Sequence, residues 1–238
     1  MLVAAIAAAM WIPAPGATLQ VQLQGKVDTT VEAEVFYVDG YDTPRATVDE
    51  LHEAGAHVVC YMSVGSWEDY RTDAKRFPRR VIGRKLDGYP EERWLDVRRI
   101  GVLLPIMSRR MDRCVKKGFD AVDFDNMDGY THKSGFPLTG RDQLRYNRRM
   151  ARAAHERGLS VSLKNDVGQL RKLVGDYDFA LNEQCLVYDE CDRYKPFVDA
   201  GKAVFHIEYE GEWDKPCEVP GFTSIRKRLS LRAYRRPC

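Results

Sequence analysis

One construction occurs four times along the chain: a helix-like stretch ending in glycine, two or three residues, and then an apolar run that ends in polar residues. The copies read HEAGAHVVCYMS, KKGFDAVDFDN, ERGLSVSLKND and DAGKAVFHIEY. Their glycines stand where a helix end favours a left-handed residue, and the β-branched runs after them are typical of buried parallel strands. Each copy therefore predicts a helix followed directly by a strand of a parallel sheet.

Eight segments of the chain qualify as strands. They are residues 19–23, 34–38, 58–62, 121–124, 160–163, 178–181, 203–207 and 222–225. Eight strands alternating with helices predict an α/β fold, a single (β/α)8 TIM barrel, in preference to a doubly wound sheet. The length of 238 residues agrees, since such barrels take about 250. Residues 94–97 are a ninth candidate strand, and residues 63–92 are expected to form a long excursion over the barrel rim.

Local signals predict where three helices begin. Thr139 and Asp142 have capping-box spacing, and Thr47 and Glu50 are spaced in the same way before another apolar stripe. Pro105 is expected to open a third helix, because proline suits a first helical turn. These helices would cover the outside of the barrel.

The first ten residues, MLVAAIAAAM, are an apolar run too short to span a bilayer but similar to the hydrophobic region of a signal peptide. No basic residue precedes this run, so we expect residues 1–10 to be a truncated or weak signal segment of a secreted protein. The alternative is an N-terminal strand or helix buried against the domain. The folded domain is expected to cover residues 11–238, and no other segment is a candidate membrane span.

The six cysteines form an even set, which in a chain with a leader-like start indicates disulfides that clip the loops. We expect Cys185 to pair with Cys191, and Cys217 with Cys238. Cys60 and Cys114 lie in apolar patterns, so they are either a third pair or buried free thiols.

Polar and mostly acidic side chains follow the predicted strands, where the active site of a (β/α)8 barrel gathers. They are Asp39, Ser63, Asp123, Asp125, Asp128, Lys164, Asn165, Asp166, Glu183, Glu208 and Glu210. Because the formal charge of the whole chain is only +2, carboxylates gathered there predict an acidic cleft for a cationic or hydroxyl-rich ligand. The small net charge does not indicate a nucleic-acid partner, and no glycine-rich phosphate-binding motif is present.

Asp123 and Asp125 alternate with apolar residues, so their side chains share one face of a strand. Asp125, nearer the rim, is predicted to face Glu183 across the mouth, as the acid and nucleophile or base pair of glycoside hydrolysis. Asp123 is interpreted as a structural carboxylate. A divalent metal held by Asp123, Asp125 and Asp128 is an alternative, although the spacing of a calcium loop is absent.

Aromatic residues accompany the same strand ends and could stack on the apolar faces of sugars. They are Tyr37, Tyr41, Tyr61, Trp67, Tyr130, Tyr188, Tyr209 and Trp213. Individually each is more often a core or rim packing residue, but together they favour a carbohydrate ligand.

Several long phrases, in order, resemble glycoside hydrolase family 114, the endo-α-1,4-polygalactosaminidases, from Trp11 to Cys238. They are WIPAPGATLQVQLQG, CYMSVGSWEDY, WLDVR, KGFDAVDFDNMDGY, LTGRDQLRYNRRMARAAHERGLSVSLKND, ALNEQC and AGKAVFHIEY. The resemblance implies a secreted barrel that hydrolyses α-1,4-linked galactosamine polymers, cationic where deacetylated. Its acidic pair would be Asp125 and Glu183, and its sugar subsite would be lined by Asp39, Tyr61, Asp123, Asn126, Lys164, Asn165 and Glu208.

The chain departs from the family pattern at two places. Leu19 and Val21 stand where the first strand commonly carries tryptophan, and Asp123 stands where the family commonly has glutamate. Two other functions therefore remain open: a carbohydrate-binding barrel without catalysis, and a hydrolase of another α-linked galactoside. In each case we expect a monomer that needs no metal or cofactor.

Overall fold

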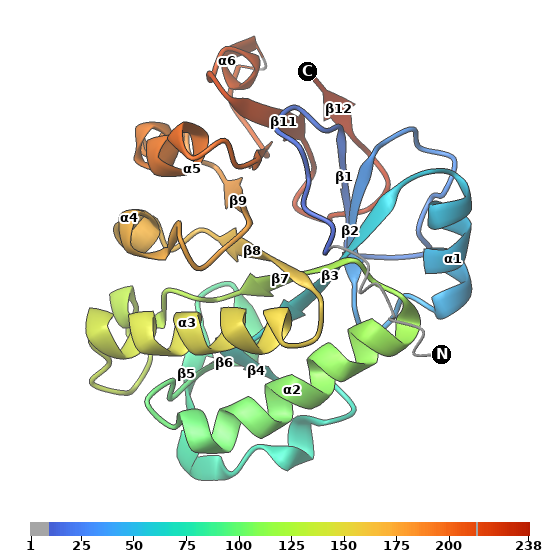
Figure 1. The fold of residues 1–238 in the computed structure, drawn as a ribbon. Coiled ribbons are helices and arrows are strands. Elements are labelled where there is room, and N and C mark those ends of the chain that lie inside the picture. The colour runs from blue at the N-terminus through green and yellow to red at the C-terminus, as the bar shows by residue number, and fades with distance from the viewer. Residues whose placement is uncertain (1–9, 213) are drawn as a thin grey trace, which may run out of the picture.

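The structure is a computed structural model that describes residues 10–212 and 214–238. Its main sheet contains the eight predicted strands in chain order, each parallel to the next (Figure 1). They are β1 (Leu19–Gln22), β2 (Val35–Asp39), β3 (His57–Ser63), β7 (Ala121–Asp125), β8 (Ser160–Lys164), β9 (Phe179–Glu183), β10 (Val204–Glu208) and β11 (Phe222–Arg226). The predicted barrel is confirmed.

The barrel has a seam between β1 and β11, which no hydrogen-bonded ladder joins in the described part of the chain. A short strand, β12 (Arg236–Pro237), instead pairs antiparallel with β11. The backbone N–H groups of Leu23 and Gln24 both donate to the carbonyl oxygen of Leu231. The C-terminal segment therefore covers the seam.

Helices lie outside the ring of strands (Figure 1). The three longest are α1 (Arg45–Glu53), α2 (Ile100–Lys117) and α3 (Gly140–His155). The later crossovers contain only α4 (Leu170–Leu173), α5 (Lys195–Asp199) and α6 (Asp214–Cys217), and no helix lies between β1 and β2, both of which are described. Single 3₁₀ turns occur at Ala74–Arg76, Arg79–Val81, Gly129–Thr131, Val167–Gln169 and Cys191–Tyr194.

The helix ends follow the predicted signals in part. All four glycines of the repeated phrase have positive φ, and Gly118 caps the end of α2 through its backbone N–H. The predicted capping box of Thr139 and Asp142 begins α3.

Two of the predicted helix starts are wrong. Helix α1 begins at Arg45 after Pro44, before the predicted Thr47 start. Helix α2 begins at Ile100, which leaves Pro105 inside it. Because proline has no backbone N–H, the carbonyl oxygen of Gly101 lacks its usual hydrogen bond within the helix. Gly101 is exposed, so water can donate a hydrogen bond to this oxygen instead.

The excursion after β3 folds as a separate antiparallel sheet on the rim. It consists of β4 (Ser66–Glu68), β5 (Ile82–Leu86) and β6 (Tyr89–Leu95), in the order β4-β6-β5. The excursion was predicted, but the ninth candidate strand at residues 94–97 is not part of the barrel, since Trp94 and Leu95 belong to β6.

The barrel interior is filled by large side chains that alternate along the strands. Tyr37, Phe179 and Phe205 make edge-to-face contacts with centroid distances of 5.9 to 6.4 Å. Below them, the Trp11 ring stacks on His57 at 4.3 Å. A second, larger core packs the outer faces of the strands against the helices. The barrel is thus a solid support for the residues at its mouth.

Three disulfides clip the fold: Cys60–Cys114, Cys185–Cys191 and Cys217–Cys238. The second and third confirm the predicted pairs. The first, left open from the sequence, joins β3 to α2. None of the described helices is both long and apolar enough to cross a membrane. Most of the segment interpreted as a leader, residues 1–9, lies outside the described residues.

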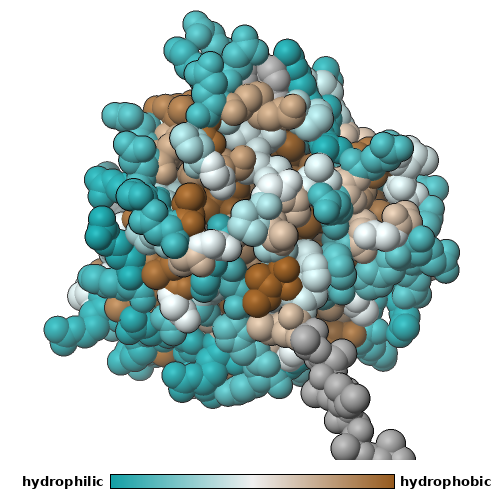
Figure 2. Space-filling view, turned by 45° about the horizontal axis from the view of Figure 1, so that its top comes forward, coloured by the Kyte–Doolittle hydropathy of each residue, from teal (hydrophilic) through white to brown (hydrophobic). Residues whose placement is uncertain are grey.

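The visible surface is polar. Figure 2 shows one face covered mainly by hydrophilic residues, with hydrophobic residues in scattered groups. This face therefore presents no broad apolar docking surface.

A buried ionic network attaches the rim excursion to the barrel. The Arg110 guanidinium of α2 makes two hydrogen bonds to Asp73, at 2.9 and 3.0 Å, and one to Glu68 at 3.1 Å. Arg71 binds Glu68 at 2.8 Å and both carboxylate oxygens of Asp39 at 2.7 and 3.0 Å. Arg110 is only 1% exposed, so removing it would leave Asp73 without its guanidinium partner and Glu68 with Arg71 alone.

We expect Arg110→Met to lower the free energy of unfolding by about 3–5 kcal/mol, because breaking a buried ion pair leaves its partner charge buried. Urea unfolding with the disulfides intact measures this loss. The matched control is Arg109→Met on the exposed side of α2, which should change stability by less than about 0.5 kcal/mol. Equal effects of the two substitutions would contradict the assigned role.

Candidate active site

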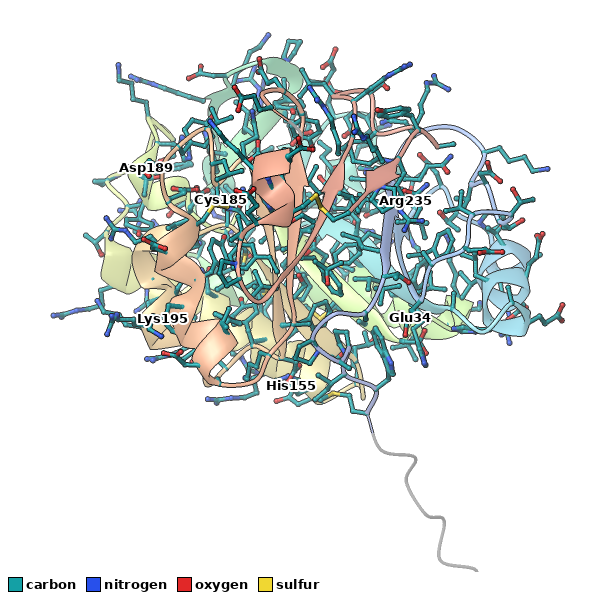
Figure 3. The ribbon with its side chains drawn as sticks, turned by 90° about the horizontal axis from the view of Figure 1, so that it is seen from above. Glu34, His155, Cys185, Asp189, Lys195 and Arg235 are labelled. Carbon is teal, nitrogen blue, oxygen red and sulfur yellow. A yellow bond between two sulfur atoms is a disulfide. The ribbon has the colours of Figure 1, made fainter. Side chains whose placement is uncertain are left out.

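A cleft of about 860 Å³ opens at the carboxyl ends of β7, β8 and β9. Figure 3 shows the polarity of the barrel: Cys185 and Asp189, which follow β9, lie at the opposite end from Glu34 and His155, which precede β2 and β8. The cleft takes its floor from the strand ends and one wall from the β5–β6 hairpin. Five predicted site residues line it: Asp125, Asn126, Lys164, Asn165 and Glu183.

The Lys164 ammonium lies between the two predicted catalytic carboxylates. Its Nζ is 3.3 Å from Asp125 Oδ1 and 3.3 Å from Glu183 Oε1. The two oxygens are therefore no more than twice 3.3 Å apart. The Lys164 side chain is 5% exposed, whereas Asp125 and Glu183 are 21% and 24% exposed and reach the cleft.

Lys164 stays charged despite its burial. Burial opposes the charged form, but Asp125, Glu183 and Asp123 outweigh it and raise the Lys164 pKa well above its ordinary value. The protein thus places one permanent positive charge beneath the pair, which is enough to allow one carboxylate to ionise inside the barrel mouth.

Asp125 is held in its ionised form. Tyr61 donates its hydroxyl to Oδ2 at 2.8 Å, and the backbone N–H of Asn126 donates to Oδ1 at 2.9 Å. Burial alone would raise the Asp125 pKa, but the Lys164 charge and these two hydrogen bonds overcome it and lower the pKa below its ordinary value. An ionised carboxylate at this position can attack carbon or accept a proton.

Glu183 faces the same ammonium from the next strand. Tyr209 donates its hydroxyl to Glu183 Oε1 at 2.9 Å, and the Asn165 side chain accepts the backbone N–H of Glu183 at 3.1 Å. Unlike Asp125, this carboxyl has no backbone N–H bound to its oxygens in the described structure. We therefore expect the two carboxyls to differ in chemical role.

The backbone turns sharply after each of the three strands. Asn126 follows β7 with φ 62°, Asn165 and Asp166 follow β8 with φ 50° and 48°, and Gln184 follows β9 with φ 65°. Such left-handed residues cost free energy when they are not glycine, although Asn and Asp tolerate the conformation best. Backbone strain concentrated beside the carboxylates indicates that their positions are functional.

Asp123 lies below the cleft and does not line it. It is completely buried, and neither of its carboxyl oxygens has a hydrogen bond of acceptable geometry among the described residues. Burial raises the pKa of Asp123 to about 7, even though the Lys164 charge opposes this. The sugar contact of Asp123 and its interpretation as a structural carboxylate both stay predictions, and its place below the cleft favours the structural role.

Asp39 and Glu208 are also kept away from the cleft by protein contacts. Asp39 is fully engaged by Arg71 and by the backbone N–H groups of Tyr41 and Asp42. Glu208 accepts a hydrogen bond from the backbone of Leu186 and contacts the buried His206. These two carboxylates hold loops of the mouth in place, and a strand-end position alone could not distinguish this role from ligand contact.

Aromatic side chains form parts of the cleft walls. Tyr89 and Tyr188 line it from opposite loops and are 59% and 64% exposed, and the Trp94 and His132 rings stack at 4.5 Å. Tyr188 was anticipated as an aromatic near the strand ends, but Tyr89 and Trp94 were missed because their position depends on how the rim sheet folds. Tyr209 was anticipated as an aromatic, without its contact to Glu183.

Three other anticipated aromatics have packing roles. Tyr37 lies in the barrel interior, and the Trp67 indole donates to the carbonyl oxygen of Ala74. Tyr41 packs among arginines, with the Arg113 guanidinium 4.0 Å from its ring centroid. Trp213 lies outside the described residues.

The cleft is most acidic deep inside. Its lining carries the carboxyl groups of Asp87, Asp125, Asp128, Asp166, Glu183 and Glu190. The lining also includes four lysines and arginines. Three of them are exposed at the outer rim: Arg84, Lys85 and Lys133. The fourth, Lys164, is buried at the bottom of the cleft. A cationic or hydroxyl-rich ligand suits this arrangement.

The residues do not assemble a carboxylate metal site. Within residues 10–212 and 214–238, the only group with metal-ligand spacing is Cys185, Cys191 and His206, and its two sulfurs form a disulfide. The alternative of a metal held by Asp123, Asp125 and Asp128 therefore finds no support, and Lys164 supplies positive charge in its place.

Comparisons with known proteins agree with this geometry. The model of glycoside-hydrolase family GH114 matches residues 2–238. The crystal structure of Aspergillus fumigatus Ega3 in complex with galactosamine is similar with a TM-score of 0.91 and 34% identity, over 99% of this chain and 100% of that chain. The family resemblance found in the sequence is confirmed. No curated protein sequence matches at a significant level.

More distant structures share the fold alone. The glycoside hydrolase domain of PelA from Pseudomonas aeruginosa gives a TM-score of 0.71 at 13% identity, over 92% of this chain and 97% of that domain. A trehalulose synthase MutB mutant gives 0.55 at 11% identity, over 84% of this chain and 58% of that one.

Asp123 gives the protein a pH-dependent stability. The pKa of Asp123 in the folded protein, about 7, lies above its ordinary value of 3.8. Its contribution to the free energy of unfolding is therefore fully present below pH 3.8 and is lost as the pH rises to about 7. In Asp123→Asn this loss is absent. We subtract the free energy of unfolding of the wild type from that of Asp123→Asn. This difference should rise by about 1.4 kcal/mol per pH unit across that window and then level off.

Urea unfolding of both proteins at pH 4.5, 5.5, 6.5 and 8 checks this expectation, with wild type measured in parallel as the control. A stability difference that stays constant over this series, or that falls as the pH rises, would show that Asp123 is already ionised in the folded protein.

Proposed function

Because the chain belongs to glycoside-hydrolase family GH114, we propose that it is a secreted endo-hydrolase of α-1,4-linked galactosamine polymers, with Asp125 and Glu183 as its catalytic pair. Membership makes it a glycoside hydrolase. The substrate is supported by the galactosamine complex of Ega3, which is similar over nearly the whole chain. The observation that carries the catalytic assignment is the pair of partly exposed carboxylates on either side of Lys164, inside the cleft.

Asp125 is assigned the role of nucleophile. Its lowered pKa keeps it ionised, and it reaches the cleft beside the Lys164 ammonium. Glu183 is assigned the role of general acid. In the first step an Asp125 oxygen bonds to the anomeric carbon, while Glu183 gives its proton to the departing glycosidic oxygen.

The second step returns the enzyme to its starting state. Glu183, now a carboxylate, accepts a proton from water, and that water oxygen displaces Asp125 from the anomeric carbon. Lys164 stabilises whichever carboxylate is ionised, and Tyr61 and Tyr209 keep the two groups oriented. Neither step requires a metal or cofactor.

The spacing of the carboxylates favours retention of configuration. Retaining glycosidases place their two carboxyls about 5–5.5 Å apart, and inverting ones about 6.5–9.5 Å apart, to leave room for a water molecule. Here the two oxygens that face Lys164 are at most twice 3.3 Å apart. That upper limit reaches only the lower edge of the inverting range.

The cleft chemistry suits a deacetylated galactosamine polymer. Its interior carboxylates would attract ammonium groups, and the exposed Tyr89 and Tyr188 offer faces for sugar stacking. Secretion is supported by the three disulfides, which persist in oxidising compartments.

Asp125→Asn and Glu183→Gln should each reduce cleavage of partly deacetylated α-1,4-galactosaminogalactan by about 10³-fold or more, because each removes an acid–base or nucleophilic group. Mass spectrometry of the released oligomers measures this loss. Asp199→Asn, an exposed carboxylate on α5, is the matched control and should retain wild-type activity.

The outcomes separate the candidate functions. Near wild-type turnover in either active-site variant would contradict that residue's assignment. Binding of the polymer without any product from the wild type would favour a carbohydrate-binding barrel. Products from another α-linked galactoside, with none from the galactosamine polymer, would change the substrate.

A further inference from the structure

Asp166 has a carboxyl oxygen that the protein leaves unsatisfied at the cleft. This residue lies two positions after Lys164, lines the cleft and is 2% exposed. Asn147 donates to its Oδ2 at 2.8 Å, and Gln143 in turn orients the Asn147 amide. Within the described part of the chain Oδ1 has no hydrogen bond of acceptable geometry, although the Tyr130 hydroxyl lies close enough to lower the pKa of the group.

A second carboxyl faces it from the neighbouring loop. Asp128 follows β7, lines the same cleft and has a side chain that is 27% exposed. Asp128 forms an ion pair with His132 at 3.3 Å when that histidine is protonated. Burial raises the pKa of Asp166 to about 8, and the Asp128 charge adds to this, so the two groups are close enough to repel each other.

Four other carboxylates near the mouth are compensated by protein cations. Lys164 serves Asp125 and Glu183, and Arg71 serves Asp39 and Glu68. Asp128 and Asp166 have no lysine or arginine partner among residues 10–212 and 214–238. A buried carboxyl that Asn147 holds in place, with a second carboxyl near it and no lysine or arginine to compensate either, is an arrangement that an external cation would complete.

An ammonium group fits this place better than a metal ion. Divalent metal ions need several oxygen ligands close together. Among the described residues, no three carboxylates lie close enough here to share one ion. An ammonium has three N–H donors and needs only two or three acceptors.

We propose that Asp166 and Asp128 form a specificity subsite that binds the free amino group of a galactosamine unit next to the one being cleaved. The inference rests on the proposed function and deepens it. Asp166 is two residues from Lys164, at most about 7 Å of chain, so the subsite adjoins the catalytic pair. An N-acetyl group is uncharged, bulkier and has a single N–H, so acetylation at this unit removes the interaction.

The test variant is Asp166→Asn, which keeps an oxygen acceptor for Asn147 but has no carboxylate that can pair with an ammonium group. The substrates are two α-1,4-galactosamine oligomers of equal length, one fully deacetylated and one acetylated. We expect kcat/KM on the deacetylated oligomer to fall by about 10- to 100-fold, mainly through KM, so that the preference for it over the acetylated oligomer is largely lost.

Asp189→Asn is the matched control. It makes the same change at a left-handed residue on the same end of the barrel (Figure 3), but Asp189 is exposed and does not line the cleft. It should keep the wild-type preference. An unchanged preference in Asp166→Asn, or an equal loss on both oligomers, would overturn the subsite. Loss of the wild-type preference on adding EDTA would assign the place to a metal instead.

Binding separates failure of the subsite from failure of the proposed function. The two oligomers are titrated by calorimetry into Glu183→Gln, with and without Asp166→Asn. If the wild type cleaves neither oligomer, the proposed function fails. Even then, the subsite is supported if the deacetylated oligomer binds more tightly than the acetylated one and Asp166→Asn removes this difference. Equal binding of both oligomers overturns it.

Discussion

A single buried ammonium, that of Lys164, determines the chemistry of this barrel mouth. Two carboxyls from neighbouring strands share it at 3.3 Å each, and a third, Asp123, lies buried beneath it. Without that charge, burial would favour the protonated form of Asp125, which could not serve as the proposed nucleophile. With it, three acids placed close together can take different protonation states, which is what the proposed acid and nucleophile roles on opposite sides of the anomeric carbon require.

The rest of the fold keeps Lys164 and its partners in place. Tyr37, Phe179 and Phe205 fill the barrel below them, so the strand ends cannot collapse inward. The left-handed residues after β7, β8 and β9 cost about 1–3 kcal/mol each, and hydrogen bonds such as the one from the Glu183 backbone to Asn165 offset part of that cost. On the rim, the Arg71 and Arg110 network secures the sheet whose hairpin forms one cleft wall.

The strands, and the positions of Asp125 and Glu183 in the cleft, could be predicted because their signals are local. A glycine, a short joint and a β-branched run define each strand, and alternation places Asp125 on the inner face. What could not be predicted depends on contacts between distant residues: the seam covered by Leu231, the rim sheet that brings Tyr89 over the cleft, and the capture of Asp39 by Arg71. In the sequence, an acidic residue at the end of a strand looks the same whether its side chain contacts a sugar or an arginine.

The most direct test of the account is to trap the sugar on Asp125. Glu183→Gln is incubated with 2-amino-2-deoxygalactosyl fluoride, whose fluoride leaves without a proton, and the digested protein is analysed by mass spectrometry. The account predicts a galactosamine adduct on the peptide that contains Asp125, because deglycosylation lacks its base. Turnover of the fluoride with inverted configuration, or an adduct on another carboxylate, would contradict the assignment of Asp125 as the nucleophile stabilised by Lys164.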